Sequence, residues 1–227
     1  MRPLSRRALG AFAAAVAFVV AVPAGAVDVD DVVRRVQERY DATEDFVADV
    51  TQEMKVASLD KSMTSRGTVA FKKPGRMRWE FTEEERQIIV ADGETLWFYR
   101  PEEQQVFKAA FDRAFRSTTP ISFLTGVGEI GDDFVVSLDG ESDDGELYYL
   151  KMVPKRADPD VGQLRLFVAQ ENGDIRGAEV RDPLGNVSTL RFRDVRRNVG
   201  LGEDQFVFEI PEDVDIITAP GAPGGEP

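Results

Sequence analysis

A two-residue alternation of apolar and polar side chains runs through most of this chain. In residues 76–81, Met77, Trp79 and Phe81 alternate with charged neighbours. Successive side chains of a strand point to opposite faces of a sheet, so this period predicts a strand with one apolar and one charged face. The period recurs from Phe46 onward, and turn-forming residues separate the segments. We therefore expect about ten or eleven strands.

Short connections between these strands predict an antiparallel sheet. Residues 163–170 and 175–181 flank Asn172 and Gly173, a strong signal for a β-hairpin. The last strand is expected in residues 205–210. So many consecutive strands predict a single large sheet with strong curvature.

Two helices are expected to cover the concave side of this sheet. Residues 28–43 place apolar side chains at helical spacing, and aspartates stand near the positive N-terminal end. Thr119 and Pro120 are typical of a helix start, so a second, short helix is expected in residues 121–125. The predicted fold class is mainly β with covering helices.

The two ends of the chain are not expected to belong to the folded domain. Residues 1–26 have the features of a cleavable secretory signal peptide: three arginines, an apolar run too short to span a bilayer comfortably, and a small-residue cleavage site. Residues 218–227 are rich in proline and glycine and are expected to be disordered. We expect residues 27–217 to form a single exported domain.

Composition excludes several classes of site. The chain has no histidine and no cysteine, which excludes a Ser-His-Asp triad, a cysteine nucleophile and a histidine-ligated zinc site. Without the signal, 25 basic residues face 41 acidic ones, a net charge of −16 that argues against nucleic acid as a partner. Two-carboxylate glycosidase chemistry stays open, although the acidic pairs fall in predicted turns. We expect no metal and no cofactor.

Residues 96–99 (LWFY) form a predicted strand that is apolar on both faces. They belong to a stretch, residues 71–115, that holds nine of the 21 aromatic residues. Alternation places Leu96 and Phe98 on one face and the other two aromatic residues on the opposite face. A dense core and a ligand cavity both explain this surface, and alternation does not decide which pair faces a cavity.

A basic cluster in residues 72–79 (KKPGRMRW) contrasts with the acidity of the chain. In one interpretation, proline and glycine shape a hairpin turn, and the basic side chains protect a sheet edge. In the other, the basic side chains form a gate at the rim of a cavity and hydrogen-bond to the covering helices. The sequence leaves both open.

Several stretches match one known family in order and spacing. They are residues 67–81 (GTVAFKKPGRMRWEF), residues 90–101 (VADGETLWFYRP) with Gln105 and Val106 after them, and residues 119–124 (TPISFL), preceded by Phe46, Thr51 and Gln52 in the opening strand. These stretches resemble the LolA family of periplasmic outer-membrane lipoprotein carriers. The similarity runs from the first helix to about Ile217.

The resemblance implies an open, incomplete antiparallel β-barrel, with a hydrophobic cavity that the two helices cover and that receives lipoprotein acyl chains. Such carriers take lipoproteins from an ATP-driven inner-membrane exporter and pass them to an outer-membrane receptor lipoprotein. The implied function is that of a periplasmic chaperone, and a monomer is expected. Candidate cavity residues are Val36, Tyr40, Met77, Trp79, Phe81, Leu96, Phe98, Ile121 and Leu124.

The candidate residues for holding the lid shut are Lys73, Arg76 and Arg78. Lys73 stands where the family often carries an arginine in this role. Lysine lacks the planar fork of donors that arginine presents, so Arg76 or Arg78 could share the contact. Two other functions stay open: an exported lipid-sensing module of envelope-stress regulation, and an extracytoplasmic carbohydrate-active enzyme.

Overall fold

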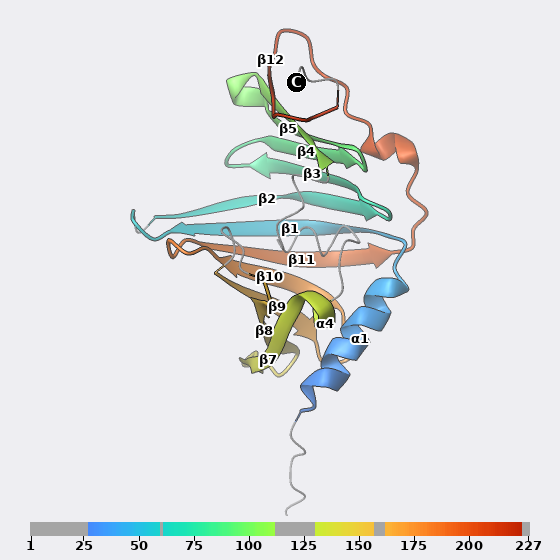
Figure 1. Ribbon diagram of the computed structural model, residues 1–227, viewed down its shortest axis with the longest axis vertical. Coiled ribbons are helices and arrows are strands. Elements are labelled where there is room, and N and C mark those ends of the chain that lie inside the picture. The colour runs from blue at the N-terminus through green and yellow to red at the C-terminus, as the bar shows by residue number, and fades with distance from the viewer. Residues whose placement is uncertain (1–26, 60, 112–129, 157–161, 224–227) are drawn as a thin grey trace, which may run out of the picture.

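The computed structural model describes residues 27–59, 61–111, 130–156 and 162–223. They form one sheet of twelve strands in the order β12-β6-β5-β4-β3-β2-β1-β11-β10-β9-β8-β7 (Figure 1). The strands are β1 (Asp45–Val56), β2 (Lys61–Lys72), β3 (Arg76–Glu83), β4 (Gln87–Asp92), β5 (Thr95–Arg100), β6 (Gln105–Ala110), β7 (Phe134–Glu141), β8 (Leu147–Pro154), β9 (Gln163–Ala169), β10 (Ile175–Arg181), β11 (Val187–Arg197) and β12 (Asp215–Thr218). The described helices are α1 (Val29–Asp41), α4 (Ile130–Asp133) and the 3-10 helices η1 (Pro101–Glu103) and η2 (Glu203–Phe206).

The sheet is open, with β12 and β7 as its two edges. Neighbouring strands are antiparallel except for β12, which is parallel to β6. The long strands β1, β2 and β11 occupy the middle, and the strand direction turns between the middle and the edges (Figure 1). This architecture confirms the predicted fold class, with twelve described strands in place of ten or eleven.

α1 begins at a capping aspartate and meets the sheet through one apolar stripe. The Asp28 carboxylate accepts a hydrogen bond from the Asp30 backbone N–H at 3.0 Å, which satisfies one of the free donors of the first turn. Val32 and Val36 lie four residues apart, on one face of the helix, and are buried against residues of β7 to β10. α1 therefore covers this half of the sheet (Figure 1).

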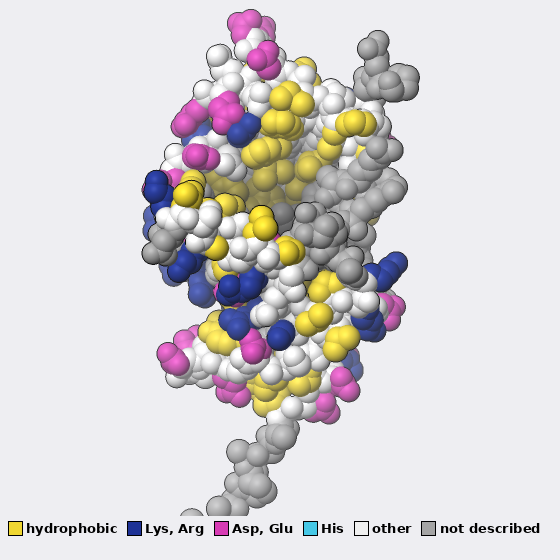
Figure 2. Space-filling model, turned by 60° about the vertical axis from the view of Figure 1, so that its left-hand side comes forward, with side chains coloured by type: hydrophobic (Ala, Val, Ile, Leu, Met, Phe, Trp, Pro, Cys, Tyr) yellow, Lys and Arg dark blue, Asp and Glu magenta, His cyan; other side chains and the backbone are white. Residues whose placement is uncertain are grey.

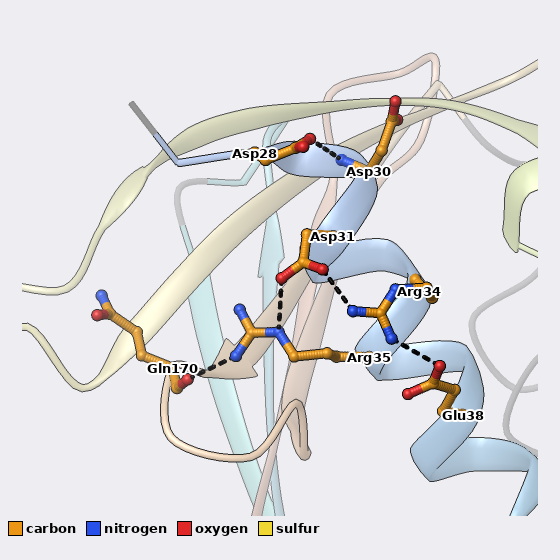
Figure 3. Close-up of polar contacts among 7 residues, drawn as sticks. All are labelled: Asp28, Asp30, Asp31, Arg34, Arg35, Glu38 and Gln170. Carbon is orange, nitrogen blue, oxygen red and sulfur yellow. Dashed lines mark hydrogen bonds and ion pairs between the residues drawn. The ribbon is translucent and has the colours of Figure 1, made fainter. Parts of the chain in front are cut away.

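The exposed face of α1 carries ion pairs (Figure 3). Arg34 lies between Asp31 and Glu38, with 2.6 Å between Arg34 Nη1 and Glu38 Oε1. Exposed pairs of this kind contribute little to stability. Arg35 differs because its Nη1 donates to the Gln170 carbonyl at 3.2 Å, which links the helix to the turn between β9 and β10.

One face of the sheet is apolar over most of its width, and we call it the inner face. Directly paired residues of antiparallel strands share a face. Leu96, Ala91, Met77, Phe71 and Phe46 are successive register partners from β5 to β1 on this face. Across the rest of the sheet, Val50 of β1 pairs with Phe192 of β11, and the same face continues through Leu190, Ala178, Leu166 and Leu150. α1 packs on this same face, so the sequence prediction of a covering first helix is confirmed.

After β11, the chain crosses the opposite, outer face of the sheet. The buried carboxylate of Asp45 accepts hydrogen bonds from the N–H groups of Val199, Gly200 and Leu201 at 2.7, 3.0 and 3.1 Å. A buried carboxylate needs such donors. Asp45 thus fixes the start of the crossing, and η2 then lies against β3 and β4 before β12 pairs with β6.

The strand predicted for residues 205–210 is wrong. η2 ends at Phe206, and the segment after it forms no strand until β12 begins at Asp215. Phe206 and Phe208 alternate as strand residues would, but they pack on the outer face and do not pair with the sheet. The alternating pattern therefore correctly indicated that Phe206 and Phe208 point the same way. It did not show whether the backbone between them forms a strand of the sheet.

The remaining sequence predictions concern the two ends of the chain and the second helix. Residues 218–223, which we expected to be disordered, continue along the sheet edge, where the Ala219 N–H donates to the Lys108 carbonyl at 2.8 Å and Ala222 is buried. The predicted signal peptide and the predicted helix in residues 121–125 lie outside the described residues. No helix in the described ranges is long and apolar enough to cross a membrane.

Candidate functional site

The inner face of β2 and β3 is built from aromatic and apolar side chains. Met77, Trp79 and Phe81 lie on it and are buried, as alternation predicts for their strand. The Trp79 ring meets the rings of Phe71 and Phe192 edge-on, with centroid distances of 5.7 and 6.4 Å. Such edge-to-face pairs add to the stabilisation that burial provides.

β5 is covered on its two faces by different parts of the molecule. Trp97 and Tyr99 lie on the outer face, where Phe208 contacts both rings at centroid distances of 6.0 and 5.9 Å. Leu96 and Phe98 lie on the inner face, and Leu96 packs against the buried aromatic cluster there. The structure thus identifies Leu96 and Phe98 as the inward-facing pair, which alternation alone did not decide.

Part of the inner face near β5 and β6 is only half-buried. Phe98 stacks on Phe107 with a centroid distance of 6.1 Å, and the Arg100 guanidinium lies 5.9 and 5.2 Å from the two ring centres. In Figure 2, hydrophobic side chains gather in a hollow in the upper half of the molecule, at the height of these strands. A hollow apolar surface is the usual setting for an apolar ligand.

A small apolar cavity lies between α1 and the middle of the sheet. Its volume is about 50 Å³, and its lining includes Val36, Tyr40, Phe46, Phe71, Ile175 and Phe192. Pockets for small-molecule ligands usually measure about 300–1,000 Å³. In this conformation the cavity is therefore too small for an acyl chain, and α1 forms one of its walls.

Lys73 connects the turn between β2 and β3 to the end of α1. Its Nζ donates to the Tyr40 carbonyl at 2.6 Å and lies 3.9 Å from the centre of the Tyr40 ring. A cation is favourable at this end because the carbonyl groups of the last helical turn carry partial negative charge. Burial lowers the pKa of the Lys73 ammonium, and the charge of Asp41 partly offsets the effect. We call the bond from Lys73 to Tyr40 the lid contact.

A buried carboxylate makes a second connection between α1 and the sheet. Asp174 lies 2.7 Å from Arg39 of α1, 3.1 Å from Arg197 of β11 and 3.9 Å from Arg176. Burial lowers the pKa of Arg197, against the opposing effect of Asp174. Sequence analysis missed Asp174, because its only signal, a position directly after an Asn-Gly turn, is equally typical of a solvated residue.

Arg76 and Arg78 do not contact α1. Arg76 lies 3.4 Å from Glu203, and Arg78 donates to the carbonyls of Gln205 and Val207 at 3.4 Å. Both alternate with side chains that face inward, so both reach the outer face and the C-terminal crossing. The expectation that they share the lid contact is not met in this structure.

The inner face also contains a residue that sequence analysis did not select. Phe111 is buried in the same cluster as Trp79. Its ring covers Gly75, where an added Cβ would lie 3.1 Å from the ring and where the φ of +66° favours glycine. The predicted residues Ile121 and Leu124 lie outside the described segments.

The family model described as outer membrane lipoprotein carrier protein LolA matches residues 41–209. The chain belongs to the LolA family. Outer-membrane lipoprotein carrier proteins from Cupriavidus taiwanensis and Nitrosomonas europaea are 32% and 31% identical to it over 161 and 172 residues. The first match covers 71% of this chain and 74% of the relative, and the second covers 76% and 82%. The resemblance seen in the sequence is therefore confirmed.

A solved structure supports the fold of this LolA-family chain. The crystal structure of an uncharacterized conserved protein from Thermus thermophilus matches with a TM-score of 0.53 and 15% sequence identity. The match covers 84% of this chain and 99% of that one. At this identity, the likeness concerns the arrangement of the strands and says nothing about a ligand.

Proposed function

We propose that this chain binds the acyl chains of lipoproteins on its inner face and carries them from the inner to the outer membrane. The main structural support is the apolar surface of β5 and β6, which is half-buried and continues the buried aromatic cluster. The names of its LolA-family relatives favour this function over a lipid sensor or a carbohydrate-active enzyme. In this proposal the protein changes no covalent bond of its cargo.

The energetics of acyl-chain burial require that the carrier also releases its cargo. Burying about 15 methylenes at about 0.8 kcal/mol each stabilises one chain by about 12 kcal/mol. Three fully buried chains would exceed the practical limit of about 18–21 kcal/mol for non-covalent affinity. Widening the small cavity beside α1 costs free energy and offsets part of this gain. The cargo can then pass from one partner to the next along increasing affinity.

The lid in this proposal is α1. Lys73 holds its C-terminal end, and Asp174 holds Arg39 in the same last turn of the helix. Both contacts join the helix to the sheet beside the small cavity, so this cavity can admit an acyl chain only when at least the end of α1 moves. The lid contact stabilises the empty form and opposes the bound form.

The proposed partners follow from this role. They are acylated lipoproteins and an ATP-driven inner-membrane exporter. At the outer membrane, delivery to a receptor lipoprotein and direct delivery both stay open. The predicted signal peptide in residues 1–26 and the family of the chain support a periplasmic location. We propose that the carrier acts there as a monomer.

Native mass spectrometry of the protein isolated from the periplasm tests the proposed function. We expect a fraction of the molecules to carry diacylated or triacylated lipoprotein, and the empty protein to bind an added triacyl lipopeptide. A protein that is isolated empty and that also fails to bind the lipopeptide would contradict the proposal.

A further inference from the structure

The turn after β1 and the turn between β10 and β11 lie at the same end of the sheet, at the left-hand ends of the strands in Figure 1. Leu59, after β1, is 64% exposed, and Leu184, between β10 and β11, is 83% exposed. They are the two most exposed large hydrophobic residues in the described part of the chain. Met54 and Met63 are also exposed and lie beside them on β1 and β2. We call these four residues the hairpin-tip surface.

Hydrogen bonds hold the two turns together. The Ala57 N–H donates to Asn186 Oδ1 at 3.1 Å, which joins the end of β1 to the turn between β10 and β11. Within that turn, the Asp182 carboxylate accepts from the backbone N–H and the side-chain amide of Asn186 at 2.9 and 2.7 Å. Leu184 therefore projects from a braced turn, and its exposure is a property of the fold.

The hairpin-tip surface continues the inner face. Met54 pairs directly with Met63. It lies four residues after Val50, so both side chains are on the same face of β1, and Val50 is buried in the aromatic cluster of the inner face. Figure 2, in which this side of the molecule comes forward, shows the hydrophobic hollow from the same direction. Met54 and Met63 thus lie on the same side of the sheet as the proposed cavity, with the polar Gln52 between Met54 and Val50.

The segments around the hairpin-tip surface have no net charge, unlike the rest of the chain. Residues 53–63 and 181–187 together contain three basic and three acidic residues, whereas the chain without its signal carries a net charge of −16. Repulsion from an anionic surface is therefore smaller here than over the chain as a whole. Lys61 and Arg181 are exposed, and such long side chains can reach lipid phosphates while their stems lie along apolar surface.

We infer that the hairpin-tip surface docks on a phospholipid bilayer, with Leu59 and Leu184 inserted among the lipid headgroups. Apolar residues with basic neighbours are typical of segments that insert at the membrane interface. The inference rests on the proposed function, since a bilayer beside the tips would supply or receive the acyl chains that the inner face binds. Docking of this kind is reversible, because two leucines bury far less apolar surface than a membrane-spanning helix.

Flotation of the mature protein with vesicles of phosphatidylethanolamine and phosphatidylglycerol tests this inference. We expect the wild-type protein to float with the vesicles and the double variant Leu59→Gln, Leu184→Gln to bind them at least about tenfold more weakly. Both substituted side chains are exposed, so folding is retained. The matched control is Val135→Gln, Val153→Gln, which removes two paired apolar side chains that are 59% and 42% exposed elsewhere on the sheet. It should bind like the wild type.

Three results would overturn the docking site. They are a wild-type protein that does not bind the vesicles, a double variant that floats like the wild type, and a dimer that the double variant loses while neither protein binds lipid. The last result would make a second copy of the chain the partner. Lipopeptide binding, measured in parallel, separates this inference from the proposed function: its absence in the wild type contradicts the carrier, whereas a double variant that keeps it but no longer floats supports the docking site.

Discussion

Two neighbouring lysines, Lys72 and Lys73, have different roles because their side chains lie on opposite sides of the sheet. Lys73 Nζ donates to the Tyr40 carbonyl on α1, whereas Lys72 Nζ donates to the Leu201 carbonyl on the C-terminal crossing, each at 2.6 Å. The two bonds are chemically alike and lie on opposite sides of the sheet. The basic cluster of the sequence therefore divides into one residue that holds the lid helix and several that hold the outer face.

Replacing Lys73 with leucine should tighten lipopeptide binding. The substitution removes a charged hydrogen bond that stabilises the closed form by about 1.5 kcal/mol, so affinity should rise about tenfold. Transfer to acceptor vesicles should slow, because closure drives release. A fluorescence titration with labelled lipopeptide measures both. Lys72→Leu is the matched control, and an equal gain in affinity there, or none in Lys73→Leu, would refute the lid contact.

Replacing Asp174 with asparagine should destabilise the fold. The change leaves Arg197 partly buried without its acidic partner and releases Arg39 of α1. We expect the free energy of unfolding in urea to fall by about 3 kcal/mol. The control is Asp31→Asn on the exposed face of α1 (Figure 3), which should leave the unfolding midpoint unchanged. Equal stability of both variants would show that Asp174 does not anchor the helix.

At the scale of elements, alternation predicts a strand well where the sheet has one core-facing side. β3 was predictable because Met77, Trp79 and Phe81 face the core, whereas the residues between them are charged and point to the outer face. β12 was not, because four exposed residues carry no such contrast and its pairing with β6 is parallel. The C-terminal crossing was not predictable either, since Asp45 holds it through contacts about 155 residues apart in sequence.

The outer-face crossing should contribute measurably to stability through Phe206. This side chain is fully buried where η2 lies against β3 and β4. We expect Phe206→Ala to lower the free energy of unfolding by about 3 kcal/mol, because it leaves a cavity in a packed interface. Val207→Ala, at the exposed neighbouring position, should change it by less than about 0.5 kcal/mol. Urea denaturation compares the two, and a similar small loss in both would mean that the crossing is loosely attached.

For the whole molecule, apolar contacts on both faces of the sheet explain why residues 71–115 contain so many aromatic side chains. The outer aromatic residues of β5 meet Phe208 of the crossing, while the inner ones continue the apolar face beside the lid. Much of the inner face was predictable from alternation and family resemblance. Asp174 was not, because its burial depends on Arg39, which is 135 residues away in sequence.

The two tryptophans of the chain lie on opposite faces, Trp79 inside and Trp97 outside. This arrangement allows a direct test of the claim that the inner face binds acyl chains. Trp97→Phe leaves Trp79 as the only tryptophan, and Trp79→Phe leaves Trp97. The measurement is the quenching of tryptophan fluorescence by a lipopeptide with brominated acyl chains, compared with the same lipopeptide without bromine. We predict strong quenching in Trp97→Phe and little in Trp79→Phe; quenching of Trp97 alone, or of neither tryptophan while the lipopeptide is bound, would contradict the account.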